Sequence, residues 1–197
     1  MLNVLVGFFL ATLITELFTT RLFRLVFWYA VNSLFLGIIA LYNGYRLSDK
    51  EMIIMGLITI VVKFLIIPYV LKYFFIKFKV KRQIVPNIAI HYSVIIIPIV
   101  LVFTLYLTTP VLYNFSSNAN YIAVAISSLM LSLLLMMEYK NVAAKIIGFL
   151  SIENSLFLLG VSATDGMPML VELGVFVDLL MLIVIINILF KYQGEKL

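Results

Sequence analysis

The chain is divided into seven apolar segments of about 20 residues each, and few kinds of fold can accommodate such a succession. Hydrophobic residues make up 64% of the 197 residues and charged residues 12%. Soluble domains are usually about one quarter charged, so this much apolar sequence cannot be hidden in one small core. The segments predict seven membrane-spanning helices, with no room left for a soluble domain: residues 2–20, 25–41, 52–74, 88–107, 121–137, 142–161 and 169–190.

The spans are expected to be α-helices because lipid cannot satisfy free backbone N–H and C=O groups. A closed β-barrel would show alternating polar and apolar residues, and runs such as 181–188 do not. The expected fold is therefore an all-α bundle. Turn-forming residues are expected to separate several helices: Asn43-Gly44, Pro86-Asn87, Thr109-Pro110, the stretch from Asn114 to Asn120, and the stretch from Asp165 to Pro168.

The basic residues predict the orientation of these spans. Of the fourteen Lys and Arg residues, eleven fall in one set of loops and termini or in the span ends beside them, two fall in the opposite set, and Lys63 lies deep within a span. Because cytoplasmic loops are enriched in Lys and Arg, we expect an outer N-terminus and a cytoplasmic C-terminus. The same distribution of basic residues explains the net charge of +5. We therefore exclude nucleic acid as a partner.

The sequence contains no cysteine and a single histidine, His91. Thiolate-held iron–sulfur clusters, bis-histidine haem within one chain, and His/Cys zinc sites are therefore excluded. No cofactor is expected in this chain. A retinal pump would need its lysine on the last span, and the segment 169–190 has none.

Ionisable residues inside the predicted spans are the candidate functional residues, because placing a charge at the bilayer centre costs about 2.5–3.5 kcal/mol or more. Glu153 and Asp178 lie near the middle of the sixth and seventh spans, and Lys63 lies near the middle of the third. We predict that these three residues share a proton path. A static hydrogen bond between helices remains the alternative for each carboxyl group.

Two further residues are assigned to the same path. Glu172 lies one turn into the seventh span, where it could line the mouth of the path or cap the helix. His91 begins the fourth span, and either proton transfer or an interfacial structural role suits it.

Glu16 and Glu138 lie near the ends of their spans and are interpreted as interfacial. The basic stretch 72–82 is either an ordinary cytoplasmic loop or a docking surface for an acidic partner or anionic lipid.

The C-terminal third carries a recognisable succession of motifs. Lys140-Asn141 opens the sixth span, and Gly148 and Glu153-Asn154 follow; Gly166-Met167-Pro168 then precedes Glu172 and Asp178. This pattern resembles component E of the hydrogenase-4 type membrane complexes. That family is related to the K subunit of respiratory complex I and to the C subunit of multisubunit cation/proton antiporters. The expected buried Glu of the K subunit would fall at Leu150, so Glu153 is displaced by nearly one helical turn.

The resemblance implies a membrane-arm subunit of a complex I-like, membrane-bound [NiFe]-hydrogenase in the cytoplasmic (inner) membrane of a prokaryote. Its expected partners are other membrane-arm subunits, both antiporter-like and quinone-module-like, and indirectly the peripheral arm that transfers electrons. Residues 1–139 would form a five-helix region, and residues 140–197 would carry the buried carboxylates, with Asn141 and Asn154 as supporting polar groups. The alternatives are a structural adaptor without ion conduction and a stand-alone secondary transporter.

Overall fold

The computed structural model describes residues 1–77, 79–86, 90–113 and 119–163. The regular elements in this part of the chain are all helices, without strands. The helices are α1 (Leu2–Leu17), α2 (Leu22–Leu47), α3 (Lys50–Thr59), the π-helix η1 (Ile60–Ile66), α4 (Ile67–Lys77), α5 (Ile90–Tyr113), α6 (Ala119–Glu138) and α7 (Val142–Ala163). The all-helical prediction is thus confirmed for these residues.

Four of the described helices are long and apolar enough to cross a membrane: Leu22–Leu47, Lys50–Lys77, Asn120–Glu138 and Val142–Ala163. The second of these combines α3, η1 and α4 in one continuous rod. Leu2–Leu17 and Tyr92–Thr108 are shorter apolar helices at the places of the predicted first and fourth spans. The predicted seventh span, 169–190, lies outside the described residues.

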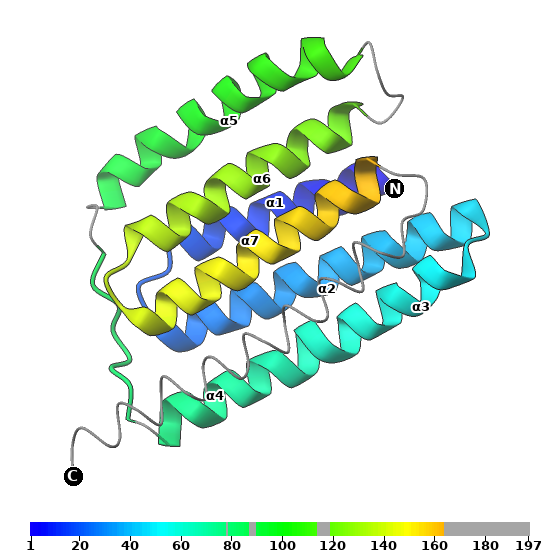
Figure 1. Cartoon of the computed structure of the whole chain (residues 1–197). Coiled ribbons are helices and arrows are strands. Elements are labelled where there is room, and N and C mark those ends of the chain that lie inside the picture. Colours follow the sequence, from blue (N-terminus) through cyan, green and yellow to red (C-terminus); the bar gives the residue numbers. More distant parts are fainter. Residues whose placement is uncertain (78, 87–89, 114–118, 164–197) are drawn as a thin grey trace.

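Consecutive helices run in alternating directions, so the chain crosses the bundle repeatedly (Figure 1). The bundle is a row with α5 at one edge, α6 next, α1 and α7 in the middle, then α2, and the α3–η1–α4 rod at the other edge. The connections after α1, α4 and α6 all lie at one end. Two isolated bridges, Arg21 with Gln83 and Pro86 with Tyr139, join them there. This end carries the basic loops, which we call the basic end.

Two predicted turns lie inside helices instead. Asn43-Gly44 is in the last turns of α2, and Ser48, the residue after this helix, has the left-handed conformation. Thr109-Pro110 is within α5, which also contains Pro98. A proline removes one backbone bond but does not end a helix if the remaining bonds hold. The glycine has a packing role, described below, that its sequence context does not reveal.

The α2–α3 contact depends on glycines that let the two backbones approach. A Cβ atom added at Gly44 would lie 2.9 Å from the backbone nitrogen of Ile53, and one added at Gly56 would lie 2.9 Å from that of Leu41. Gly148 makes a similar approach between α7 and the backbone of Met136 on α6. Small residues at such positions are typical of packing between membrane helices.

We expect Gly44→Ala to lower the free energy of unfolding by about 1–3 kcal/mol, because the new methyl group would push α3 away from α2. Gly7→Ala is the matched control, since a Cβ atom there meets nothing within 4 Å. Thermal unfolding of the detergent-solubilised chain measures both. A Gly44→Ala variant as stable as the Gly7→Ala variant would contradict the close packing.

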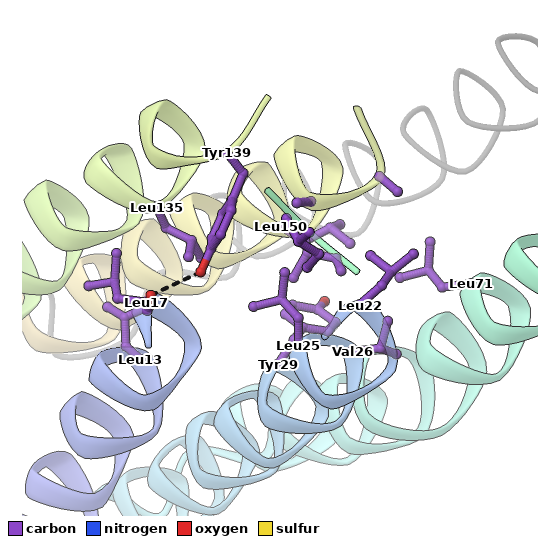
Figure 2. Packing of buried hydrophobic residues seen from close by; sticks show 14 of the residues in the cluster. Leu13, Leu17, Leu22, Leu25, Val26, Tyr29, Leu71, Leu135, Tyr139 and Leu150 are labelled. Carbon is purple, nitrogen blue, oxygen red and sulfur yellow. Dashed lines mark hydrogen bonds between the residues drawn. The ribbon is translucent and has the colours of Figure 1, made fainter. Parts of the chain in front are cut away.

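A large apolar core lies near the basic end and joins helices distant in sequence. Its members include Leu17, Leu25, Leu71 and Leu150, with Tyr139 placed among them (Figure 2). The Tyr139 hydroxyl lies 2.9 Å from the backbone oxygens of both Leu17 and Thr19, to which it can donate. These bonds hold the α6–α7 connection against the end of α1. A second, smaller core surrounds Phe9, Leu36 and Leu158.

Candidate functional site

An ion pair between Lys63 and Glu153 lies in the interior of the bundle. The Lys63 Nζ atom donates to Glu153 Oε1 at 2.9 Å, although the two residues are 90 positions apart. Their side chains are 3% and 9% exposed, so both charges are almost wholly removed from solvent. Each residue lies near the middle of an apolar helix long enough to cross a membrane. Placing a charge at such a position is costly unless an opposite charge accompanies it.

Lys63 is presented by the π-helix η1, and the sequence suggests why the helix widens there. The N–H of Ile67 bonds to the carbonyl of Val62, five residues earlier, as in a π-helix. Pro68 follows directly, and its ring cannot donate to the carbonyl of Phe64 and would crowd it in a regular α-helix. Lys63 is the buried residue of this segment, and π-segments are frequent at functional sites.

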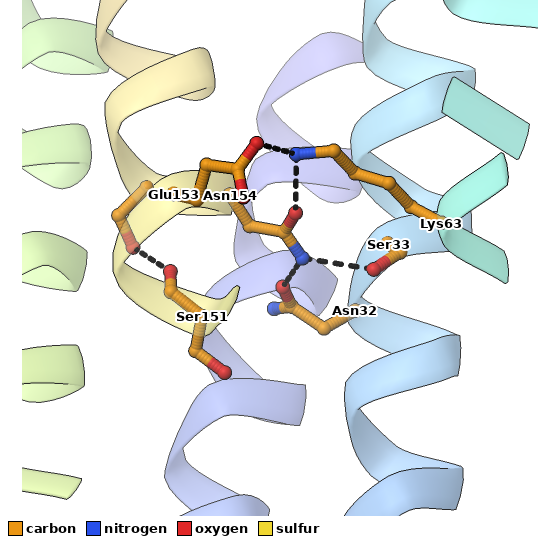
Figure 3. Close-up of polar contacts among 7 residues, drawn as sticks. Asn32, Ser33, Lys63, Ser151, Glu153 and Asn154 are labelled. Atoms are coloured by element: carbon orange, nitrogen blue, oxygen red, sulfur yellow. Dashed lines mark hydrogen bonds and ion pairs between the residues drawn. The ribbon is translucent and has the colours of Figure 1, made fainter. Parts of the chain in front are cut away.

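Asn154 connects the ion pair to α2. Its Oδ1 atom accepts a bond from Lys63 Nζ at 3.4 Å, while its Nδ2 atom donates to Asn32 Oδ1 at 3.1 Å and to Ser33 Oγ at 2.9 Å (Figure 3). Asn154, predicted as a supporting polar group, thus lies beside the ion pair and bonds to the lysine; its supporting role stays a prediction. Lys63 also faces the ring of Phe157, with Nζ 5.9 Å from the ring centre.

The polar network continues from α2 to α1. Asn32 Nδ2 donates to the backbone oxygen of Phe9 at 2.9 Å and to Thr12 Oγ1 at 3.0 Å. Asn32, Ser33 and Asn154 are fully buried, and Thr12 nearly so. One network of side chains therefore joins four elements, namely η1, α7, α2 and α1. A buried polar network of this kind is costly if any member loses its partner.

The remaining predicted site residues have different outcomes. Asp178 and Glu172 lie outside the described residues, so their predicted places on the path stay predictions. His91 is in the first turn of α5, and its side chain also lies outside the described part. Asn141 is not in the network: it precedes α7, and its Oδ1 atom accepts a bond from the backbone N–H of Ala143 at 2.9 Å. That is a helix-capping role.

The interpretation of Glu16 and Glu138 as interfacial was wrong in one respect. Both lie near helix ends, as predicted, but both side chains are fully buried within the protein. Ser151 Oγ donates to Glu16 Oε2 at 2.7 Å, and Ser93 Oγ donates to Glu138 Oε1 at 2.7 Å. Distance from the helix end gave the depth of each residue, but not whether it faces lipid or neighbouring helices.

A sequence signal for Glu16 did exist. Thr12 and Glu16 are four residues apart in α1 and so share one face of that helix. On α7, Ser151, which bonds to Glu16, is four residues before Ser155, so these two residues also share a face. Ser155 in turn lies 3.0 Å from Ser132 of α6, oxygen to oxygen. Small hydroxyl residues at helical spacing mark the faces that meet, and a carboxyl group on such a face points inward.

The described residues contain no cluster of three or more His, Cys, Asp or Glu side chains that could hold a metal ion. The ion pair and its amide partners can instead bind, release or stabilise a proton. If Glu153 accepts a proton, its attraction for the Lys63 ammonium is lost and the pair can separate. The arrangement provides titratable groups inside an apolar bundle.

Comparison with known proteins shows a distant similarity. The chain is 24% identical over 157 residues to the protein named Rv0085 from Mycobacterium tuberculosis, described as uncharacterized. The match covers 78% of this chain and 71% of that protein. No protein-family model and no solved structure matches the chain.

Proposed function

We propose that the chain is a membrane-arm subunit of a complex I-like, membrane-bound hydrogenase. In this proposal it carries part of a proton or Na⁺ path coupled to electron transfer in a peripheral arm. The observation that carries the proposal is the Lys63–Glu153 ion pair, buried at mid-helix and 2.9 Å across. Ionisable groups at this depth mark ion pathways in membrane proteins more often than they serve packing alone. The motifs around Glu153 and Asn154 supply the link to hydrogenase-4 component E.

The proposed topology has seven spans in the cytoplasmic membrane of a prokaryote, with the N-terminus outside and the C-terminus inside. Four long apolar helices and two shorter ones support the first six spans. The connections with most of the basic residues meet at one end of the bundle, as a cytoplasmic end requires (Figure 1). In the proposed topology, a seventh span over 169–190 would return the chain to that end.

We expect a phosphatase reporter that is active only outside the cytoplasm to be inactive when fused after Arg82 or after the C-terminal Leu197. The same reporter inserted at Ser48, between α2 and α3, should be active, because that connection lies at the opposite end. Reporter activity in intact cells, normalised to fusion protein level, measures both. Strong activity after Leu197 would refute the proposed orientation or the seventh span.

The subunit assignment is tested by purification. A chain tagged at the C-terminus and extracted in mild detergent should recover other membrane subunits, a nickel–iron large subunit and stoichiometric nickel. The isolated chain should be less stable than the assembled one, since binding to partner subunits stabilises the folded state. A stable, monodisperse and nickel-free monomer as the main species would count against the assignment.

A structural adaptor is the second candidate, and the network itself favours it. The amide of Asn154 is bonded on both sides, to Lys63 and to Asn32 and Ser33, so the side chains lock four elements together. Such locking is sufficient reason to keep buried polar groups. The two functions differ in whether neutralising Glu153 stops ion transfer in an assembled complex.

A further inference from the structure

Glu16 and Glu138 form a second buried carboxyl site that the Lys63–Glu153 pair does not explain. Both side chains have zero exposure. Glu16 Oε1 and Glu138 Oε2 have no hydrogen-bond partner among the described residues, and within that part of the chain neither carboxyl group has an ion pair. The only bonds to these groups there come from the hydroxyls of Ser151 and Ser93.

The two carboxyl groups flank one tyrosine. Glu138 directly precedes Tyr139, and Glu16 directly precedes Leu17, whose backbone oxygen accepts from the Tyr139 hydroxyl. Burial raises the pKa of Tyr139, and any negative charge on Glu138 or Glu16 would raise it further. Tyr139 therefore remains a neutral donor. Its proton is directed to the backbone oxygens of Leu17 and Thr19 and away from the carboxyl groups. The tyrosine thus supplies no charge that could balance either acid.

Two buried carboxylates without a cation would cost several kcal/mol each, whereas a neutral carboxylic acid in the same place costs far less. A single hydroxyl donor offsets only a small part of that cost for each group. The unpartnered oxygens are the atoms on which an added proton would reside. The chemistry of the site therefore favours two bound protons over two bare charges.

The site lies about one helical turn from the ion-pair network. Glu16 and Thr12 lie on one face of α1, one turn or about 6 Å apart, and Thr12 bonds to Asn32. On α7, Ser151 contacts Glu16 and precedes Glu153 by two residues. Glu138 and Glu16 lie toward the basic end, while Lys63 and Glu153 lie at mid-helix. The carboxyl pair thus stands between the basic end and the ion pair.

We propose that Glu16 and Glu138 are a proton-storing pair, held as neutral acids, that receives protons from the basic end and supplies the Lys63–Glu153 ion pair. In the transfer, the Glu16 carboxyl group becomes a carboxylate and Glu153 becomes neutral, so charge is conserved and the lysine ammonium is released from its partner. The direction of proton transfer, from the Glu16–Glu138 pair to Glu153, rests on the proposed function. The protonated state of the pair does not depend on that function.

The test is infrared spectroscopy of the tagged full-length chain, purified with the subunits it retains and placed in lipid vesicles near neutral pH. Protonated carboxyl groups absorb separately from carboxylates. Glu16→Gln and Glu138→Gln should each remove part of the protonated-carboxyl absorption, and the double variant should remove the sum. Glu153→Gln should instead remove carboxylate absorption, because Lys63 keeps that group ionised.

Glu51→Gln is the control, since Glu51 is exposed at the start of α3 and should contribute only carboxylate absorption. Glutamine resembles a neutral acid in shape and can accept the same serine bonds, so both variants should fold; circular dichroism and the unfolding temperature verify this. Unchanged protonated-carboxyl absorption in both Glu16→Gln and Glu138→Gln would overturn the proposal. Proton transport is not needed for this readout, so the proposed function can fail while the carboxyl pair stands.

Discussion

Replacing Glu153 by glutamine is expected to stop most ion translocation while leaving the complex assembled. Glutamine keeps the size of the side chain and retains an oxygen that can accept from Lys63 Nζ. In the unchanged protein, that nitrogen lies 2.9 Å from Glu153 Oε1. It cannot bind and release a proton. A positioned proton-transfer group typically contributes about 10²- to 10⁴-fold, so we expect the rate to fall by at least about tenfold.

The measurement is proton uptake by vesicles that hold the reconstituted complex, with subunit content quantified in the same samples. Electron transfer in the peripheral arm should persist, slowed or uncoupled. Glu51→Gln serves as the matched control, because that carboxyl group is exposed at the start of α3. Undiminished pumping by a fully assembled Glu153→Gln complex would remove this residue from the path and favour the adaptor.

Removing the lysine should destabilise the protein more than removing both charges. Lys63→Met takes the ammonium away from Glu153 and leaves a nearly buried carboxylate beside Asn154. Removing one partner of a buried pair without keeping its hydrogen bond typically costs about 3–5 kcal/mol, whereas replacing both partners together is often close to neutral. We therefore expect Lys63→Met to lower stability strongly and Lys63→Met with Glu153→Gln to recover most of the loss.

A double-mutant cycle of unfolding free energies in detergent measures this coupling. Lys145→Met on α7 is the control, since that lysine is exposed and should change stability little. Additive effects of the two substitutions would show that the ion pair does not couple the α3–η1–α4 rod to α7. Equal loss of stability in Lys145→Met would show that the effect is not specific to the buried lysine.

The sequence was sufficient to predict helices and their approximate places because long apolar runs leave little choice in lipid. It also identified Lys63, Glu153 and Asn154, since polar residues in the middle of such runs are conspicuous. It did not show which of them touch: Lys63 and Glu153 are 90 residues apart, and that pairing depends on how α7 packs beside η1. Asn32 and Thr12 extend the network, but in the sequence they look like ordinary polar residues. Their contact depends on how α1 packs against α2.

The interpretations of Gly44, Glu16 and Glu138 failed because packing between helices decides the role of each residue. Gly44 looked like a turn residue, but its missing side chain is needed where α2 meets α3. Glu16 and Glu138 do lie near helix ends, as predicted, yet the position of a residue along a helix says nothing about the direction its side chain faces. The direction depends on neighbours, which here are Ser151 and Ser93 on other helices.

The π-helix η1 affects how relatives of this chain should be aligned. A π-turn contains about one more residue than an α-turn of the same length, so residues 60–66 shift the phase between α3 and α4. A relative with a regular α-helix in this segment could hold its lysine at the same point in space with one residue fewer in its sequence. An alignment without a gap would then place that lysine opposite Val62 or Phe64 and miss the equivalence. Comparison across such relatives therefore has to follow positions in space along this rod, with one gap allowed inside it.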